Sequence, residues 1–375
     1  MHSDAGQFNR LYIHVPFCQN KCDYCAFYSE TGIDEKKVDR YLERLSGEFK
    51  EKSDQCSTLK SIYIGGGTPT YLSAAQLERL FSEISSGFEI HSDAEISIEA
   101  NPDTLDDTVL RTLSAFCTRI SVGVQTLDKS LRSAIGRKSR EYNIGAVIEK
   151  IKKSSIQNIS CDLIYGIPGQ TCEMLSKDLN TIIQAGVTHI SAYSLTYEEN
   201  TILGDKKEYE EEIYSELEAE MWDLIEKQLY QHSIYRYEIS NYSKKGYECR
   251  HNLEIWYGDT YLGCGPAAAS FDGRTRTTNP PDLRQWLDRK QPEADLISQK
   301  YRAKEILMMG LRTVDGWKEE IFHSRTGFSF SDLSETVDRV EKAGLIRYDK
   351  ETGTIKCTSK GLACWNDTAL IIIQS

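Results

Sequence analysis

Three cysteines in one short segment have the clearest capacity for chemistry. Cys18, Cys22 and Cys25 stand at spacings of four and three, so their thiolates can converge on one metal centre from a single loop. Zinc is one candidate, but a structural zinc site normally takes four ligands. No second Cys-x-x-Cys occurs, and His14 is awkwardly placed as the fourth ligand. An iron–sulfur cubane normally takes four thiolates, so three leave one iron open to an exchangeable ligand.

The rest of the composition is that of an ordinary globular chain. The 375 residues are 39% hydrophobic and 27% charged, and no apolar run approaches the roughly 18 residues that a membrane span needs. Eleven cysteines is an odd count, and no basic-then-apolar leader precedes the first predicted strand. We therefore expect reduced thiols in the cytoplasm rather than a disulfide framework. The net charge of −12 argues against nonspecific binding to nucleic acid or to an anionic membrane.

Short β-rich runs alternate with amphipathic helical stretches over the first half of the chain. This alternation predicts βαβ units and a parallel sheet, and six repeats predict a partial barrel, since a complete one has eight. The expected strands cover residues 11–17, 61–64, 95–100, 119–125, 158–165 and 189–196. The expected helices cover residues 34–52, 73–88, 104–116, 142–153 and 171–185.

These strands differ from ordinary buried parallel strands because one face of each is polar. In the third strand Ile96 and Ile98 alternate with polar residues that include Glu99, and Gln125 and Asp162 lie on the corresponding face of later strands. With a side-chain period of two, one face meets the helices and the other collects polar groups. Such a face is costly to bury dry, so we expect it to line a wet, ligand-filled cavity.

The second half of the chain is less regular. An acidic helix is expected near residues 206–232, where residues 205–227 hold ten acids against three lysines. Residues 233–290 are predicted to be rich in loops. Beyond residue 298 the pattern is helix, helix, a hairpin-like pair and a short helix, as in a small winged-helix unit. Its helices mix both charge signs, which favours a scaffold or lid over contact with nucleic acid.

These patterns predict an α/β protein with three parts. Residues 1–200 are expected to form the partial barrel with the cysteine loop. Residues 201–297 are expected to form a helix and loop extension, and residues 298–375 the small winged-helix-like unit.

The triad directly after the first strand resembles the C-x-x-x-C-x-x-C signature of radical S-adenosylmethionine proteins. The resemblance implies a (βα)6 partial barrel and a [4Fe-4S] cluster held by Cys18, Cys22 and Cys25. It also implies that the open iron chelates the amino and carboxylate groups of S-adenosylmethionine. Electron transfer then cleaves the sulfonium to a 5′-deoxyadenosyl radical, while the protein supplies orientation and excludes solvent.

Further motifs resemble the subfamily of oxygen-independent coproporphyrinogen III oxidase. A glycine run follows the second strand, where glycine permits close backbone approach to a ligand. The resemblance implies S-adenosylmethionine contacts at Tyr12, Tyr24, Gly66, Gly67, Thr68, Glu99, Gln125, Arg137 and Asp162.

Within this subfamily the chain most resembles the HemW heme chaperones. The matching stretches include GGGTPTYL, EANPDT, SVGVQT, DLIYGIPG and RHNLEIW. The oxidase carries a fourth cysteine two residues after the triad, where this chain has Phe27, and a long N-terminal extension, whereas Cys18 is close to the start here. Both differences weigh against decarboxylation of a porphyrinogen.

HemW proteins carry a His-Asn-x-x-Tyr segment implicated in heme binding. His251 and Asn252 match it, but Ile255 occupies the tyrosine position, while Trp256 and Tyr257 could form an aromatic wall. A neutral histidine is a good axial ligand of heme iron, and Cys249 is a second possibility. The alternative is that His251 only hydrogen-bonds to the backbone of its loop.

Three functions therefore remain open. The favoured one is a heme chaperone with a cluster that binds S-adenosylmethionine. Its implied partners are heme, an apo-hemoprotein acceptor and a flavodoxin or ferredoxin reductant. Where the acceptor is bound to a membrane, the chain would meet it by peripheral contact. The chain itself is expected to be a monomer or dimer. The second is a radical enzyme, either an oxidative decarboxylase in porphyrin biosynthesis or a methylase. The third is an α/β protein stabilised by zinc.

Overall fold

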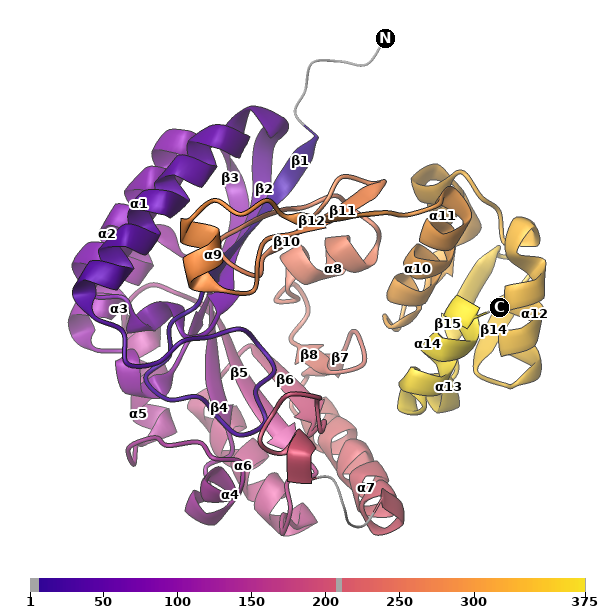
Figure 1. Cartoon of the computed structure of the whole chain (residues 1–375). Coiled ribbons are helices and arrows are strands. Elements are labelled where there is room, and N and C mark those ends of the chain that lie inside the picture. The colour runs from indigo at the N-terminus through magenta and orange to yellow at the C-terminus, as the bar shows by residue number, and fades with distance from the viewer. Residues whose placement is uncertain (1–6, 207–210, 375) are drawn as a thin grey trace.

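A curved nine-stranded sheet forms the centre of the protein (Figure 1). The structure is a computed structural model that describes residues 7–206 and 211–374. The strand order is β7-β8-β6-β5-β4-β3-β2-β1-β9, and β1 to β6 are parallel and consecutive. The prediction of a six-repeat partial barrel is therefore confirmed. The six strands are β1 (Phe8–Val15), β2 (Cys56–Gly66), β3 (Ile90–Ala100), β4 (Arg119–Gln125), β5 (Asn158–Tyr165) and β6 (His189–Ser194).

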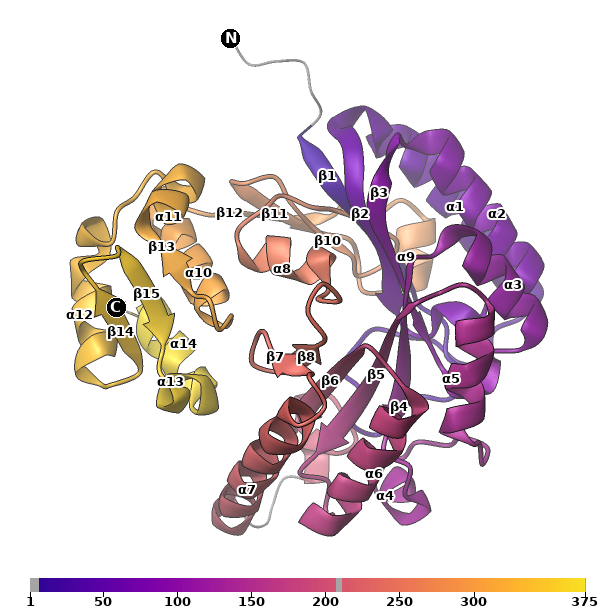
Figure 2. The same cartoon turned by 180° about the vertical axis from the view of Figure 1, so that it is seen from behind.

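Helices cover the outer face of this sheet, as Figures 1 and 2 show from opposite sides. They are α1 (Glu35–Lys52), α2 (Ala74–Gly87), α3 (Asp107–Phe116), α4 (Lys129–Ala134), α5 (Ile144–Lys153), α6 (Cys172–Ala185) and α7 (Glu211–Tyr230). The expected helix near 206–232 corresponds to α7, and residues 207–210 lie outside the described residues. Short 3₁₀ turns occur at Ser53–Gln55, Pro69–Tyr71, Pro102–Thr104, Gly204–Lys206 and Ser331–Leu333.

Local sequence fixes the ends of these helices. The side chain of Asp34 accepts a hydrogen bond from the backbone of α1, and Ser73 and Gln76 form a reciprocal capping box at the start of α2. Gly186 ends α6 in the left-handed conformation that glycine adopts without steric cost. The apolar members of each strand, such as Ile13 and Ile64, are fully buried against the helices. This burial fixes the position of each strand and therefore the position of the polar residues at its end.

The region from 233 to 297 contains more regular structure than the sequence predicts. Strand β9 pairs in parallel with β1, and β8 pairs antiparallel with β6, so both edges of the barrel are extended. Three further strands make a small antiparallel sheet in the order β10-β11-β12. The strands are only two to four residues long and lack a clear alternation, which is why the pattern gave no signal. They are β7 (Tyr235–Arg236), β8 (Asn241–Ser243), β9 (Leu262–Cys264), β10 (Ala269–Phe271), β11 (Thr275–Thr278) and β12 (Glu293–Leu296), with helices α8 (Arg250–Trp256) and α9 (Leu283–Leu287).

The C-terminal segment forms a separate small unit with its own core. Its strands pair in the order β13-β15-β14, and β14 and β15 are the predicted hairpin. Buried Trp317, Phe322 and Phe330 lie at the centre of this core. Helices packed against a three-stranded sheet match the expected winged-helix arrangement. The elements are α10 (Gln299–Leu311), β13 (Trp317–Lys318), α11 (Glu319–Thr326), α12 (Ser334–Lys342), β14 (Ile346–Asp349), β15 (Thr354–Cys357), α13 (Ser359–Ala363) and α14 (Trp365–Gln374).

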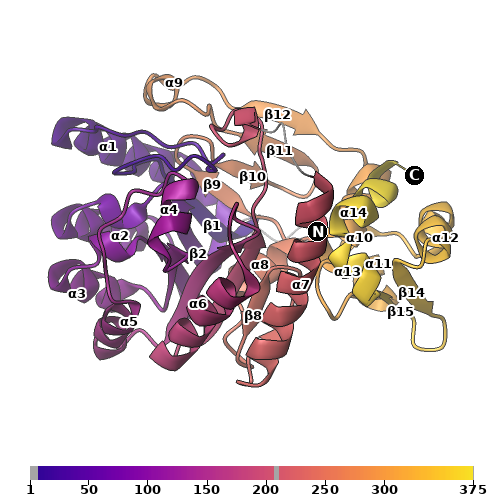
Figure 3. The same ribbon diagram turned by 90° about the horizontal axis from the view of Figure 1, so that it is seen from below.

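The C-terminal unit faces the inner side of the curved sheet, opposite the covering helices (Figure 1). Seen from below, α7 lies between the barrel and the α13–α14 pair (Figure 3). Within residues 7–206 and 211–374, no helix combines the length and the apolar character that crossing a bilayer requires.

Candidate functional site

The cysteine loop, residues 18–29, is closed at its base and clamped from two sides. Phe17 and Glu30 form an isolated bridge, and the amide of Cys18 donates to the carbonyl of Glu30 at 2.9 Å. In the middle of the loop, the Asp23 amide donates to Ile135 O at 3.1 Å, and Asp23 O accepts from the amide of Leu203 at 2.9 Å. The loop is thus fixed before any cofactor binds.

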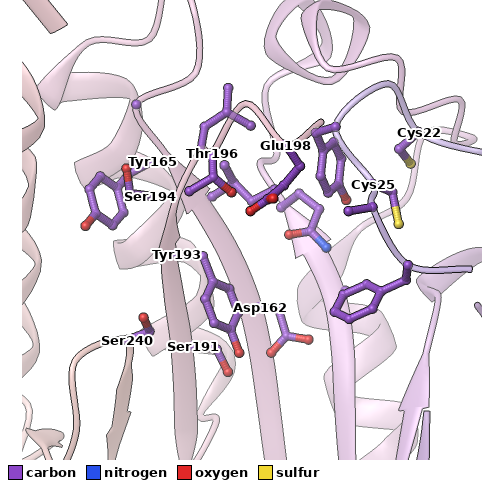
Figure 4. Close-up of a pocket in the computed structure, with 18 of the residues that line it drawn as sticks. Cys22, Cys25, Asp162, Tyr165, Ser191, Tyr193, Ser194, Thr196, Glu198 and Ser240 are labelled. Carbon is purple, nitrogen blue, oxygen red and sulfur yellow. The ribbon is translucent and has the colours of Figure 1, made fainter. Parts of the chain in front are cut away.

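The three thiols of this loop face one cavity. Cys18, Cys22 and Cys25 all line it, and Figure 4 shows the sulfur atoms of Cys22 and Cys25 at its edge. Burial raises the pKa of Cys18 and of Cys25, and the neighbouring thiols raise both pKa values further. A bound cationic centre would remove this penalty on the thiolates. Among the described residues, no group of three or more His, Cys, Asp and Glu side chains is placed to hold a single metal ion.

The glycine run lies directly against the cysteine loop. The Gly67 amide donates to Val15 O at 2.8 Å, the Thr68 amide donates to Phe17 O at 2.7 Å, and Thr68 Oγ1 lies 3.5 Å from Cys18 Sγ. A Cβ atom at Gly67 would lie 2.7 Å from Phe17 O. No side chain fits in that space, so glycine is required for the two loops to meet.

Gly66 must also be a glycine, for two reasons. Its φ of +111° is one that other residues rarely adopt, and a Cβ would lie 2.7 Å from the His14 ring. Its amide is thereby free to donate to Glu99 Oε2 at 3.1 Å. The run therefore links the cysteine loop to the carboxylate of the third strand.

Arg137 joins the cysteine loop to the fourth strand. Its Nη1 donates to Cys22 Sγ at 3.9 Å, its Nη2 donates to Gly123 O, and its Nε is buried with no hydrogen-bond partner. Tyr24 lines the same part of the cavity, and burial raises the pKa of its hydroxyl. A buried guanidinium with an unsatisfied donor beside the cysteine loop fits a ligand carboxylate.

Glu99 and Asp162 carry half-buried carboxyl groups on neighbouring parts of the cavity wall. Burial, with a smaller contribution from Asp162, raises the pKa of Glu99 to about 7, although hydrogen bonds from Tyr63 OH at 2.9 Å and from the Gly66 amide lower it. Burial also raises the pKa of Asp162, which accepts from Ser121 Oγ at 2.9 Å. Both carboxyl groups therefore hold a proton more readily than a carboxyl group in water does, and a cationic ligand would favour their ionised forms.

Gln125 reaches the cavity through a strained backbone. Its φ of 66° is uncommon for a residue other than glycine, and the pairing of β4 with β5 shifts register between Gly123 and Gln125. Such strain costs about 1–3 kcal/mol and clusters at functional sites. The irregularity brings its amide close to Gly123, where a Cβ would lie only 3.2 Å from Gln125 Nε2.

These groups border one large cavity of about 2720 Å³. Ligand pockets commonly occupy roughly 300–1,000 Å³, so the volume leaves room for more than one ligand. Most of the predicted site residues meet there. Those that line it are Cys18, Cys22, Tyr24, Cys25, Gly66, Gly67, Thr68, Glu99, Gln125, Arg137 and Asp162.

Tyr12 does not line the cavity, although it is close to it. Its ring stacks on Tyr63 with centroids 6.3 Å apart, and its hydroxyl lies 3.1 Å from His14 Nδ1. Tyr63 in turn donates to Glu99. The structure therefore places Tyr12 behind the wall of the cavity, supporting a residue that faces it.

His251 is buried behind the same wall. Its Nδ1 lies 2.9 Å from Ser61 Oγ, its ring packs against Tyr63 at 5.4 Å, and burial lowers its pKa to about 3. Asn252 is the member of the pair that lines the cavity. Cys249 is also buried, with its pKa raised to about 12, which disfavours the thiolate that would bind iron.

The prediction that the whole polar face lines a cavity is wrong for part of that face, at Glu95 of β3 and His189 of β6. Both side chains are buried, Glu95 against the backbone amides at the start of α8 and His189 against Tyr237, which lies between β7 and β8. Glu95 accepts from the amides of Arg250 and His251 at 2.9 and 3.0 Å, and His189 Nδ1 lies 2.8 Å from Ser160 Oγ. The polar groups are satisfied by other protein groups, which removes the penalty that a dry interior would impose.

Several cavity residues were not found from the sequence. Ser191 and Tyr193 stand on β6, where alternation with apolar residues was a usable signal (Figure 4). Phe27, which is 68% exposed, lines the cavity beside Cys25. Trp222 of α7 and Trp365 of α14 complete the far side. No sequence pattern links those two helices to the barrel.

The predicted aromatic wall of α8 faces another way. Trp256 lies under the guanidinium of Arg312 at 5.0 Å, and Tyr257 packs edge-on against Trp317 at 5.0 Å. These rings attach α8 to the C-terminal unit, so they hold that unit in place over the cavity.

Comparisons with known proteins agree with this geometry. Residues 12–182 match the Radical SAM superfamily. The heme chaperone HemW of Lactococcus lactis is 32% identical over 371 residues, covering 96% of each chain. The chain belongs to the HemW family. The HemW of Bacillus subtilis is 36% identical over 350 residues, covering 89% of this chain and 92% of its own.

The chain also shares its fold with a solved structure. Coproporphyrinogen III oxidase from Escherichia coli, a radical SAM enzyme, superposes with a TM-score of 0.83 at 22% identity, covering 98% of this chain and 90% of the oxidase. As a radical SAM protein, the chain has a place for a [4Fe-4S] cluster and for S-adenosylmethionine. The donor set fits: three thiols face one cavity beside an unsatisfied buried guanidinium.

Proposed function

We propose that this protein is a heme chaperone, which binds heme and delivers it to apoproteins and carries a [4Fe-4S] cluster that binds S-adenosylmethionine. The observation that carries the proposal is full-length similarity to HemW relatives, which includes the segment around His251 and the C-terminal unit as well as the barrel. Phe27 supports it as well, because the oxidase subfamily carries a cysteine at that position.

Cys18, Cys22 and Cys25 would hold the cluster. When bound and reduced, the cluster supplies an electron that can cleave the sulfonium of S-adenosylmethionine. Arg137 presents its free Nε to a carboxylate, and Glu99 and Asp162 offer carboxylates to cationic groups of the ligand. The remaining proposed contacts are Tyr24, Gly66, Gly67, Thr68 and Gln125, with Tyr12 supporting the wall.

Heme would occupy the wider part of the same cavity. Trp222 and Trp365 offer aromatic surface there, and Asn252 comes from the segment that matches the His-Asn motif. His251 remains a proposed heme-binding residue, but direct ligation would require it to leave the position beneath Tyr63. In its present position it contributes by supporting Tyr63 and by holding α8 in place.

The proposed partners follow from this function. The protein would pass heme to an apo-hemoprotein acceptor, including acceptors at a membrane surface that it meets by peripheral contact. A flavodoxin or ferredoxin would reduce the cluster. We propose a cytoplasmic location and a monomer or dimer, without a nucleic-acid partner.

Anaerobic reconstitution tests the proposal. The protein is loaded with iron and sulfide, titrated with heme and with S-adenosylmethionine, and followed by absorbance and paramagnetic resonance. We expect saturable heme binding at a fixed stoichiometry, a change of the cluster signal with S-adenosylmethionine, and transfer of heme to an apo-hemoprotein.

The matched reaction contains coproporphyrinogen III, a reductant and the same loaded protein. If 5′-deoxyadenosine forms in step with loss of coproporphyrinogen, the protein is a radical enzyme and the chaperone proposal is wrong. If the loaded protein binds no heme, the proposal is equally wrong.

A further inference from the structure

Arg119 is a buried cation on the cavity wall that the proposed cofactors do not use. It is the first residue of β4, its side chain is only 2% exposed, and it lines the cavity. Its Nε and Nη1 atoms are buried without any hydrogen-bond partner, which leaves three N–H donors unsatisfied. Buried donors in folded proteins are nearly always paired with protein, water or ligand, so this group needs an acceptor from outside the chain.

Neighbouring side chains do not provide that acceptor. Arg119 Nη2 lies 3.5 Å from His189 Nδ1, but His189 is already engaged by Ser160 Oγ at 2.8 Å and by Tyr237 OH at 2.8 Å. Glu95 is close enough to act on Arg119 electrostatically, yet its oxygens accept from backbone amides of α8. Among the described residues, Arg119 forms no ion pair within 4.0 Å.

We propose that Arg119 is the anchor of a carboxylate-binding subsite at the inner end of the cavity, which takes a carboxylate side chain of the bound porphyrin. The inference rests on the proposed function for the identity of the ligand. A guanidinium is a planar fork of donors that matches the two oxygens of a carboxylate. Asn252 and Tyr63 line the same cavity and offer a polar and an aromatic surface beside it.

The subsite adjoins the place expected for S-adenosylmethionine, because Arg119 acts electrostatically on Glu99 and Asp162, but it lies at the end of β4 away from the cysteine loop. Arg119 and Gln125 occupy opposite ends of β4, and six residues of extended strand span about 20 Å. Arg137, which contacts Cys22, already offers a donor at the cluster end. Since Arg137 already offers a donor for the carboxylate of S-adenosylmethionine, we assign the carboxylate at Arg119 to a second ligand.

The test crosses a change in the protein with a change in the ligand. Hemin and hemin dimethyl ester, which lacks free carboxylates, are titrated in the same detergent buffer into wild-type protein, Arg119→Gln and Arg119→Lys. Arg44→Gln is the matched control, because Arg44 also has a buried unpaired Nε but does not line the cavity. S-adenosylmethionine affinity is measured on each cluster-loaded variant, and thermal melting shows whether each variant folds.

Wild-type protein and Arg44→Gln are expected to bind hemin about 10- to 100-fold more tightly than the diester, as expected for a charge-assisted hydrogen-bonded pair. Arg119→Gln should bind both compounds with the affinity that wild-type protein shows for the diester, and Arg119→Lys should lie between. Because the charge of Arg119 also favours the ionised forms of Glu99 and Asp162, S-adenosylmethionine affinity should fall in Arg119→Gln, but much less than hemin affinity does.

Four results would overturn the subsite while leaving the chaperone function standing. The first is that wild-type protein binds the two compounds with equal affinity. The second is that folded Arg119→Gln loses affinity for both compounds to the same extent. The third is a selective loss of S-adenosylmethionine affinity in that variant, which would assign Arg119 to that ligand. The fourth is an unchanged preference for hemin in Arg119→Gln, which would show that a group other than Arg119 recognises the carboxylates. If wild-type protein binds neither compound, the proposed function and the subsite both fail.

Discussion

Replacing Glu99 with glutamine should make the cofactor-free protein more stable, and the gain should grow with pH. Glu99 is half-buried in the cavity wall, and loss of solvation raises its pKa from an ordinary value of 4.5 to about 7. Between these two pH values the folded protein keeps a proton that the unfolded chain has lost. Stability therefore falls as the pH rises through this window and levels off above about 7.

The size of the effect follows from the pKa. The difference between 4.5 and about 7, at ~1.36 kcal/mol per pH unit, corresponds to about 3 kcal/mol for complete ionisation. A practical range begins near pH 5.5, because a chain with a net charge of −12 at pH 7 loses solubility as its carboxylates are protonated. From there to pH 8.5 the wild-type protein should lose about 2 kcal/mol that Glu99→Gln does not lose.

The assay is urea unfolding of the cluster-free protein at several pH values. The free energy of unfolding of Glu99→Gln minus that of wild-type protein should rise by about 2 kcal/mol across the range. Loss of the hydrogen bonds from Tyr63 and Gly66 shifts this difference by a constant, so the slope carries the information. Glu43→Gln, an exposed change on α1, is the control and should give no slope.

A difference that is flat with pH, or that grows toward acid, would refute the argument that burial raises the pKa of Glu99. The same carboxylate should favour a cationic ligand. Affinity of cluster-loaded wild-type protein for S-adenosylmethionine should therefore rise as the pH passes through about 7, and in Glu99→Gln it should be weaker and independent of pH there.

Other predictions concern the cluster, the glycine run and the α8 segment. Cys22→Ser should reduce the iron and sulfide bound after anaerobic reconstitution to background. Cys117 is buried and does not line the cavity, so Cys117→Ala should retain both. Retention by Cys22→Ser would contradict the ligand assignment. Gly67→Ala should lower the free energy of unfolding in urea by about 1–3 kcal/mol and weaken binding of S-adenosylmethionine, because the new Cβ would lie 2.7 Å from Phe17 O. An unchanged affinity would contradict the contact between the two loops. Asn252→Ala should weaken heme binding without loss of stability, while His251→Ala should lower both heme affinity and stability. If His251→Ala is stable but has no heme affinity, His251 ligates heme directly.

The sequence alone was sufficient for the barrel and for much of the site. Period-two alternation and intervening amphipathic helices predicted the six parallel strands, and the bounds of β4 and β5 agree to the residue. The same alternation placed Glu99 and Asp162 on one face. Because parallel strands end at the same edge of a sheet, it also predicted that these residues meet beside the cysteine loop.

Local rules could not tell which polar residues face the cavity. Glu95 and Glu99 lie on the same face of β3, yet the amides of α8 satisfy the first and the second borders the cavity. Nor could they place His251, which matches a binding motif but lies behind Tyr63 while its neighbour Asn252 faces the cavity.

Local sequence is enough to identify the groups that can do chemistry. They are three spaced thiols, a glycine run and polar residues at strand ends, and all of them follow from spacing and backbone preference. The extent and the lining of the cavity, in contrast, follow from the tertiary structure alone. α7, α8 and α13–α14 reach it by contacts between segments far apart in the chain, such as Trp256 with Arg312. Those contacts depend on packing across the whole molecule, which no local pattern encodes. For that reason the unpaired guanidinium of Arg119 became visible only in three dimensions.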